Sequence, residues 1–135
     1  MESEQMNEFR PLILVAEDDD SNFKLIKAII GKKCDIEWAK NGQEMVELFQ
    51  QHQQRAKAML MDIKMPVMNG YEAMKAIRSS GHPIAETIPI IAMTANAFVE
   101  DIHDALDAGM NVHVAKPVDM QVLKETVAQV IGGRS

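Results

Sequence analysis

The chain has 135 residues, of which 47% are hydrophobic and 25% are charged, as is ordinary for one soluble globular domain with its own core. The net charge is −6 and the longest cationic run is Lys32-Lys33, which argues against direct nucleic-acid binding because phosphate contacts need cationic clusters. The single cysteine excludes an internal disulfide, and the sequence has neither a secretory signal nor an apolar run long enough to span a membrane. We therefore expect a cytoplasmic domain without membrane insertion.

The first half of the chain alternates between apolar runs and amphipathic segments. Residues 1–10 are polar and are expected to form a loose leader. The continuously apolar residues 12–16 predict a buried strand, after which Asp20-Ser21-Asn22 is expected to cap a helix. A short strand is expected at residues 36–39. Asn41, followed three positions later by Glu44, is a variant of the capping box and predicts the start of a second helix.

The second half continues this alternation. Residues 58–61 predict a strand, and a loop then leads to Gly70 and a helix that ends after Arg78 at the turn residues 79–83. A buried strand is expected at residues 88–93, with Pro89 tolerated only near its start. A helix then runs to Gly109, a strand covers residues 112–115, and Asp119 opens the last helix. Five β/α units with short connections favour a doubly wound α/β fold, in which helices cover both faces of a parallel sheet.

Chemically active side chains follow four of these strands. In a parallel sheet the carboxyl ends of the strands lie at one edge, so these side chains should converge there. They are Glu17-Asp18, Asp62, Thr94 and Lys116. Two strand ends that carry carboxylates indicate a shared cation site, and they leave one carboxylate available as a nucleophile toward phosphorus.

This set of motifs resembles the receiver domain of two-component response regulators, in order and in spacing, over residues 11–131. The motifs are Glu17-Asp18, Asp62 with Met65-Pro66 and Asn69-Gly70, Thr94-Ala95, and Lys116-Pro117. The resemblance implies a flavodoxin-like fold with strand order 2-1-3-4-5 and leaves residues 132–135 as a short tail. Segments such as Gly70-Tyr71-Glu72-Ala73 are similar to segments of receivers in hybrid sensor histidine kinases. An excised module and a free-standing regulator are both compatible with the sequence.

The resemblance also implies a role for each residue of the set. Asp62 would accept a phosphoryl group from a phosphohistidine on a histidine kinase or a histidine phosphotransfer domain. Mg²⁺ would be held by the carboxylates of Asp18 and Asp62 and the backbone carbonyl of Lys64, with Glu17 acting through water. Thr94 and Lys116 would contact the phosphoryl oxygens. The domain would be a regulatory phosphoacceptor rather than an enzyme.

Further residues are expected to govern the response and its duration. By resemblance, Thr94 moves toward the phosphoryl group and the segment 95–115 repacks to alter partner binding. His113 stands where the family usually carries Tyr or Phe as a switch coupled to Thr94; the sequence is equally compatible with a half-buried strand residue. Lys64 and Asn96 lie two positions after Asp62 and Thr94, near the path of the hydrolytic water implied by the family.

Other interpretations are open for single residues and for the whole chain. Alone, Glu17 and Asp18 could cap a helix, Asp62 could be a turn acid, Thr94 a cap and Lys116 a solvated cation. A phosphohydrolase of the haloacid-dehalogenase type also uses an Asp nucleophile and Mg²⁺, but it expects an acid where this chain has Lys64. A flavodoxin-like cofactor binder would place a phosphate against the acids at 17–20, which would repel it. A degenerate receiver that acts as a scaffold would not need the full set. The four histidines lack the compact spacing of a zinc site.

Overall fold

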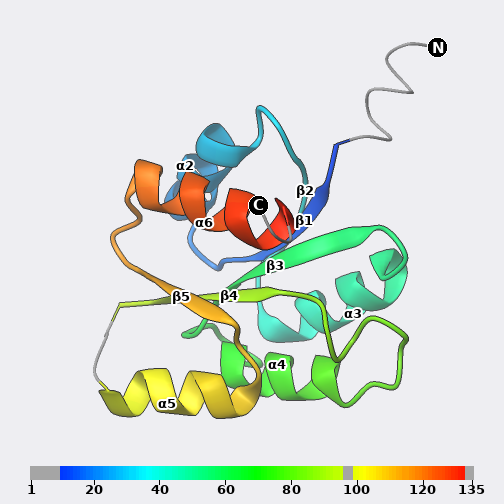
Figure 1. Cartoon of the computed structure of the whole chain (residues 1–135). Helices are drawn as coiled ribbons and strands as arrows, with labels where there is room; N and C mark the ends of the chain where they lie inside the picture. Colours follow the sequence, from blue (N-terminus) through cyan, green and yellow to red (C-terminus); the bar gives the residue numbers. More distant parts are fainter. Residues whose placement is uncertain (1–9, 96–98, 133–135) are drawn as a thin grey trace, which may run out of the picture.

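The computed structural model describes residues 10–95 and 99–132, which form a five-stranded sheet between two layers of helices (Figure 1). The strands are β1 (Leu12–Ala16), β2 (Asp35–Ala39), β3 (Ala56–Asp62), β4 (Ile90–Thr94) and β5 (Val112–Ala115). The helices are α2 (Asp20–Ile30), α3 (Gly42–His52), α4 (Gly70–Arg78), α5 (Val99–Ala108) and α6 (Met120–Gly132). Every strand predicted from the sequence is present, and each is followed by a helix.

All neighbouring strands are parallel and their order is β2-β1-β3-β4-β5, which confirms the predicted doubly wound, flavodoxin-like fold. Helices α2 and α6 cover one face of the sheet, and α3, α4 and α5 cover the other (Figure 1). A hydrophobic core lies on each face of the sheet, and successive residues of β1 point into these two cores alternately. Ile13 and Val15 pack toward α2 and α6, and Leu12 and Leu14 pack toward the opposite layer. Because both faces are covered, β1 is apolar without alternation.

The predicted strand at residues 88–93 is displaced in the structure to Ile90–Thr94. The N–H of Ile88 donates to the carbonyl of Ile84 in the preceding turn, 2.9 Å away, so Ile88 belongs to that turn rather than to the sheet. Pro89 has no N–H to donate, but its carbonyl accepts from Met59, also at 2.9 Å. At its other end the strand extends to Thr94, which pairs with Ala115. Strand β3 is also longer than predicted and includes Asp62, which pairs with Met93.

The helix caps differ in detail from the predicted ones. Asp19 caps α2, and its side chain accepts a 2.9 Å hydrogen bond from the N–H of Asn22. Asn41 caps α3 as predicted, but the Glu44 side chain accepts from the N–H of Lys40 instead of closing the reciprocal bond. The complete capping box is at α4, between Asn69 and Glu72.

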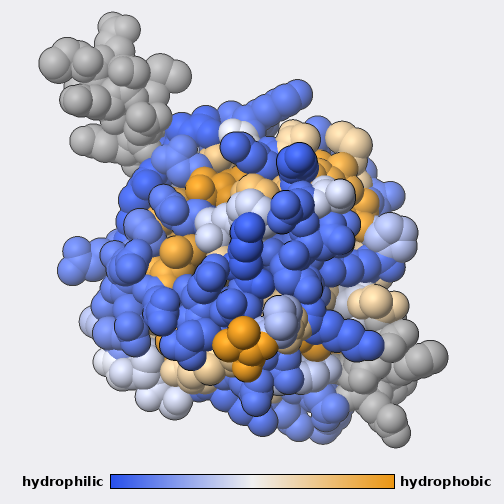
Figure 2. All heavy atoms as spheres, turned by 180° about the vertical axis from the view of Figure 1, so that it is seen from behind, coloured by the Kyte–Doolittle hydropathy of each residue, from blue (hydrophilic) through white to orange (hydrophobic). Residues whose placement is uncertain are grey.

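The surface is largely polar on the side shown in Figure 2, where hydrophobic side chains form separate patches. The large hydrophobic side chains that are exposed among the described residues are Leu25, Val67, Leu106, Met120 and Val122. Within residues 10–95 and 99–132, no helix has the length and apolar character needed to cross a membrane.

Candidate functional site

The carboxyl ends of β1, β3, β4 and β5 surround an open cleft of about 810 Å³. Five of the residues singled out from the sequence line it: Asp18, Asp62, Lys64, Thr94 and Lys116. Glu17 is fully buried, whereas Asp18 beside it is exposed. The structure therefore brings together side chains that lie up to 98 positions apart in the sequence, as the parallel topology predicts.

Three carboxylates converge at this cleft. One oxygen each from Glu17, Asp18 and Asp62 lies within 4.8 Å of the other two. Asp62 is only 3% exposed, so its charge is poorly shielded by water. Oxygen-only donor sets of this kind suit hard divalent cations such as Mg²⁺, Ca²⁺ and Mn²⁺.

Lys116 is the cation that faces these acids. Its ammonium Nζ lies 3.0 Å from Oδ2 of Asp62 and 3.2 Å from Oε2 of Glu17. Burial alone would lower the pKa of Lys116, but the carboxylates of Asp62 and Glu17 outweigh burial and raise that pKa. Lys116 therefore stays charged and holds the two buried acids together.

One cation does not satisfy the acidic group. Burial, and then the nearby charge of Asp62, raises the pKa of Glu17 to about 7, although Lys116 opposes the shift. Burial also raises the pKa of Asp62, again against the effect of Lys116. Although Oε2 of Glu17 is close to Lys116, it accepts no hydrogen bond of acceptable geometry from any described residue. When ionised, three carboxylates beside one ammonium carry an excess of two negative charges, which a divalent cation would neutralise.

The backbone around Asp62 allows the start of α4 to lie close to the end of β3. The N–H of Ile63 donates to Met93 at 3.2 Å, and the N–H of Gly70 donates back to Ile63 at 2.9 Å, which brings the start of α4 against the end of β3. A Cβ at Gly70 would collide with the backbone carbonyl of Asp62, so only glycine permits this contact. Between them, Val67 has a φ of 68° and is 82% exposed, an unusual conformation for a β-branched residue.

The backbone of Lys116 is fixed by a hydrogen bond to the neighbouring strand. Its N–H donates to the carbonyl of Thr94 at 2.9 Å, which ties the end of β5 to the end of β4. The peptide bond between Lys116 and Pro117 is cis. From the end of β5, with β4 lying between β5 and β3, the side chain of Lys116 reaches Asp62.

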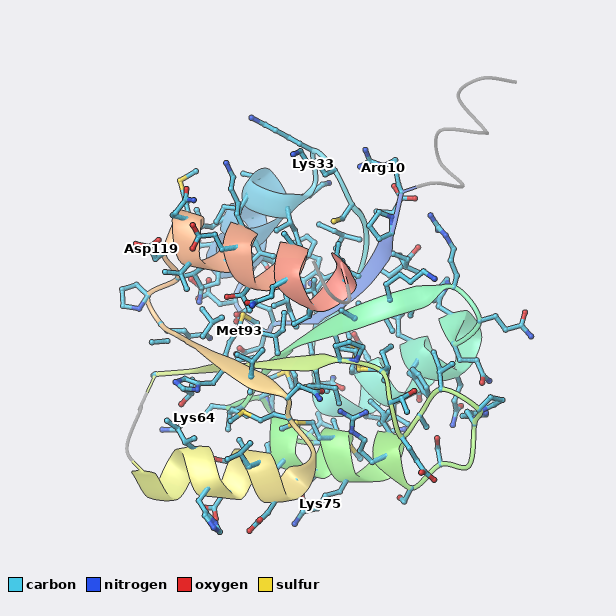
Figure 3. All side chains as sticks on the ribbon, viewed as in Figure 1. Arg10, Lys33, Lys64, Lys75, Met93 and Asp119 are labelled. Carbon is cyan, nitrogen blue, oxygen red and sulfur yellow. The ribbon has the colours of Figure 1, made fainter. Side chains whose placement is uncertain are left out.

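The expected switch and lifetime residues lie at the same end of the sheet. Thr94 is half-buried at the end of β4, and Lys64 projects near the cleft from the loop after β3 (Figure 3). His113 is half-buried on β5 opposite Ala92, so the alternation of side chains puts it on the same sheet face as Thr94. Asn96 lies outside the described residues.

Some cleft residues were not anticipated from the sequence. Asn22, in the first turn of α2, and Tyr71, in the first turn of α4, both line the cleft. Asn22 follows the acids at 17–20, and Tyr71 follows Asn69-Gly70. These positions are the available signal, because helices that follow the strands begin at the same edge of the sheet. Among the described residues, the group of His, Cys, Asp and Glu side chains that could hold a metal consists of the three acids.

An open, doubly wound parallel sheet with an acidic cleft and a lysine at its strand ends defines the structural class of this protein. Residues 13–128, most of the chain, match the family described as response regulator receiver domain. The chain belongs to this family, and it is therefore a receiver domain of two-component signalling.

Relatives in sequence agree with this assignment. The chain is 37% identical over 119 residues to hybrid signal transduction histidine kinase I of Dictyostelium discoideum, covering 85% of this chain and 7% of that protein. It is 32% identical to the sensor histidine kinase RcsC of Salmonella typhimurium, covering 87% of this chain and 12% of that protein. The chain thus spans only a small part of the length of the curated relatives it matches.

Solved structures agree as well. The receiver domain of a sensor histidine kinase from Pseudomonas aeruginosa, solved with a magnesium ion in its active-site cleft, is 34% identical, with a TM-score of 0.81 and coverage of 92% of this chain and 99% of that one. A chain in the complex of a Saccharomyces cerevisiae histidine phosphotransfer protein with the receiver domain of its downstream response regulator is 29% identical. Its TM-score is 0.79, and coverage is 88% of this chain and 87% of that one.

Proposed function

We propose that this domain is a phosphoacceptor switch in which Asp62 receives a phosphoryl group from a phosphohistidine in a Mg²⁺-dependent reaction. The proposal rests mainly on the environment of Asp62. Its carboxylate lies 3.0 Å from Nζ of Lys116 and belongs to a group of three acids at an open cleft. The donor would be a histidine kinase or a histidine phosphotransfer domain, and the yeast complex among the structural relatives supports this class of partner.

The acids fit Mg²⁺ by charge and by chemistry. Asp18, Asp62 and the backbone carbonyl of Lys64 would ligate it directly, and Glu17 would act through water. The bound cation would neutralise the acids and the incoming phosphoryl oxygens. The pseudomonad receiver with magnesium in its cleft supports this choice of ion. The unsatisfied, fully buried oxygen of Glu17 is an independent feature of this chain that favours a cation here.

The reaction then depends on charge and position. A carboxylate oxygen of Asp62 forms a bond to phosphorus while the bond from phosphorus to the donor imidazole nitrogen breaks, and the nitrogen keeps the electron pair. Lys116 already contacts Oδ2 of Asp62, so it needs only a small movement to contact a phosphoryl oxygen. The hydroxyl of Thr94 donates to another. The protein supplies positioning and neutralisation, as in other phosphoryl transfers.

Phosphorylation would act on the segment 95–115, of which residues 95 and 99–115 are described. The Thr94 hydroxyl moves toward the new charge, and β5 with His113 and the preceding helix α5 repacks toward an active population. Leu106 on α5 is 51% exposed and would lie on the partner-binding surface. We take residues 11–131 as the receiver domain, with a leader at 1–10 and a tail at 132–135. The single free cysteine, Cys34, favours a reducing cytoplasmic setting.

The test is direct. The protein is incubated with acetyl phosphate, with and without Mg²⁺, and the adduct is measured by intact mass and by its stability in acid and base. We expect an acid-stable, base-labile adduct that requires Mg²⁺ and is lost in Asp62→Asn. Continuous release of phosphate without a detectable adduct would instead indicate a phosphohydrolase. Lack of both adduct and turnover would indicate a scaffold, and either result would overturn the proposal.

A further inference from the structure

The acidic loop between β1 and α2 is anchored by a residue that does not line the cleft. Strand β2 holds the peptide of Glu17 on both sides: its N–H donates to Ala39 at 3.0 Å, and its carbonyl accepts from the indole Nε1–H of Trp38 at 2.8 Å. The ladder between β1 and β2 ends at the pair Ala16 and Ala39. The indole therefore supplies a donor where the strand backbone stops supplying one.

The indole is itself held in one orientation. Phe23 of α2 stacks on Trp38 with ring centroids 4.0 Å apart and an angle of 4° between the planes. The ammonium of Lys40 lies 4.9 Å from the centroid of the Trp38 ring. The side chain of Trp38 thus contacts Glu17 at the start of the acidic loop and Phe23 just after the loop.

The acids between these two contacts need such anchoring. Glu17, Asp18 and Asp62 are held close together despite their mutual repulsion, which the ammonium of Lys116 offsets in part. A backbone that could relax would let Asp18, which is exposed, move away from the other two. Fixing the Glu17 peptide therefore keeps the oxygen donors ready before a cation arrives.

We propose that Trp38 is a positioning residue for the cation site, because it fixes the Glu17 carbonyl and so holds the acidic loop in the arrangement that a divalent cation requires. The proposal rests on the proposed function and adds to it a residue that acts from outside the cleft. Since Trp38 is the single tryptophan, its fluorescence also reports this contact.

The test measures Mg²⁺ binding by isothermal titration calorimetry without any phosphodonor, in wild type, Trp38→Phe and Ile36→Val. Trp38→Phe keeps an aromatic ring but removes the N–H donor; Ile36→Val perturbs the same strand without touching the loop contact. We expect Trp38→Phe to weaken Mg²⁺ binding by about three- to tenfold, the value of one lost hydrogen bond. Saturating Mg²⁺ should restore its phosphorylation yield, and Ile36→Val should bind as wild type does.

Fluorescence gives a second readout that does not depend on whether Trp38→Phe folds. Mg²⁺ should change the emission of Trp38 in the wild-type protein and leave it unchanged in Asp18→Asn. Unaltered Mg²⁺ affinity in Trp38→Phe, or unaltered emission while calorimetry shows binding, would overturn the positioning role alone. Absence of Mg²⁺ binding to the wild-type protein would instead contradict the proposed Mg²⁺-dependent function.

Discussion

Arg78 at the end of α4 donates two hydrogen bonds to the carbonyl of Gly109, from Nη2 at 2.6 Å and from Nε at 3.1 Å. The same guanidinium donates to the carbonyls of Ala85 and Ile88 and to the side chain of Asn111. Burial lowers the pKa of Arg78 from its usual high value. This one side chain therefore joins α4, the turn before β4 and the turn between α5 and β5.

We expect Arg78→Ala to destabilise the protein by about 2–3 kcal/mol, because several partly buried carbonyls lose their donor together. Arg78→Lys should recover only part of this loss, since an ammonium lacks the planar fork that reaches separate carbonyls. The measurement is urea unfolding in EDTA. The matched control is Lys75→Ala, an exposed position on the same helix (Figure 3), which should change stability by less than about 0.5 kcal/mol. Equal effects at the two positions would refute this role of Arg78.

Lys116 should compete with a divalent cation for the same carboxylates. Its Nζ pairs with both Asp62 and Glu17, so removing its charge by Lys116→Met leaves the acids more attractive to Mg²⁺. We expect Mg²⁺ to bind at least several-fold more tightly in this variant, because two charges about 4 Å apart interact by about 1 kcal/mol in water and by more near a protein surface. Phosphorylation by acetyl phosphate should nevertheless be slower. Weaker Mg²⁺ binding in calorimetry would show that Lys116 organises the acids more than it competes for them.

The raised pKa of Glu17, about 7, predicts how the metal-free protein responds to pH. Its folded-state pKa lies above the unfolded value of about 4.5, so the folded state binds the proton more tightly. Stability without metal should therefore be greatest at low pH within this range and should fall as pH rises from about 5 to 8, by on the order of 1–3 kcal/mol. Asp62, whose pKa is also raised, adds to the same trend.

Two comparisons test this pH dependence. Glu17→Gln should flatten the stability profile in EDTA, because the amide does not titrate. Mg²⁺ should compete with the proton, so its affinity for the wild-type protein should increase between pH 6 and 8. A wild-type stability profile in EDTA that rises over this interval would contradict the buried environment given for Glu17.

Lys64 and Asn96 are expected to set the lifetime of the phosphorylated state rather than its formation. Lys64 lies at the cleft two residues beyond Asp62, where a side chain can affect the approach of a hydrolytic water. Exchanging the two residues, Lys64→Asn with Asn96→Lys, should change the dephosphorylation rate several-fold while the maximum phosphorylation yield changes little. The measurement is the decay of the adduct after the phosphodonor is removed, with Lys75→Asn as the control. An unchanged decay rate in the double variant would dismiss this expectation.

The amino-acid sequence predicts the order of the strands and helices along the chain and the chemical type of the residues that follow the strands. Continuous apolar runs identify strands covered on both faces, and the parallel connection of β/α units sends Asp18, Asp62 and Lys116 to one edge of the sheet. These inferences succeed because they depend on local periodicity and on the handedness of short connections. The strand order was expected from the family resemblance and not from periodicity. The chemical roles of the site residues are proposed, and the phosphodonor experiment tests them.

Which side chains meet, and how strongly they act on each other, depends on how the strands and helices pack. The pKa of Glu17 depends on burial and on Asp62 and Lys116, which are far away in the sequence. The indole of Trp38 reaches the carbonyl of Glu17, and Arg78 reaches the turn at Gly109, across separate elements. No local pattern contains these contacts, because they arise when whole strands and helices pack. In this protein the sequence locates the site, and the packing sets its charge balance.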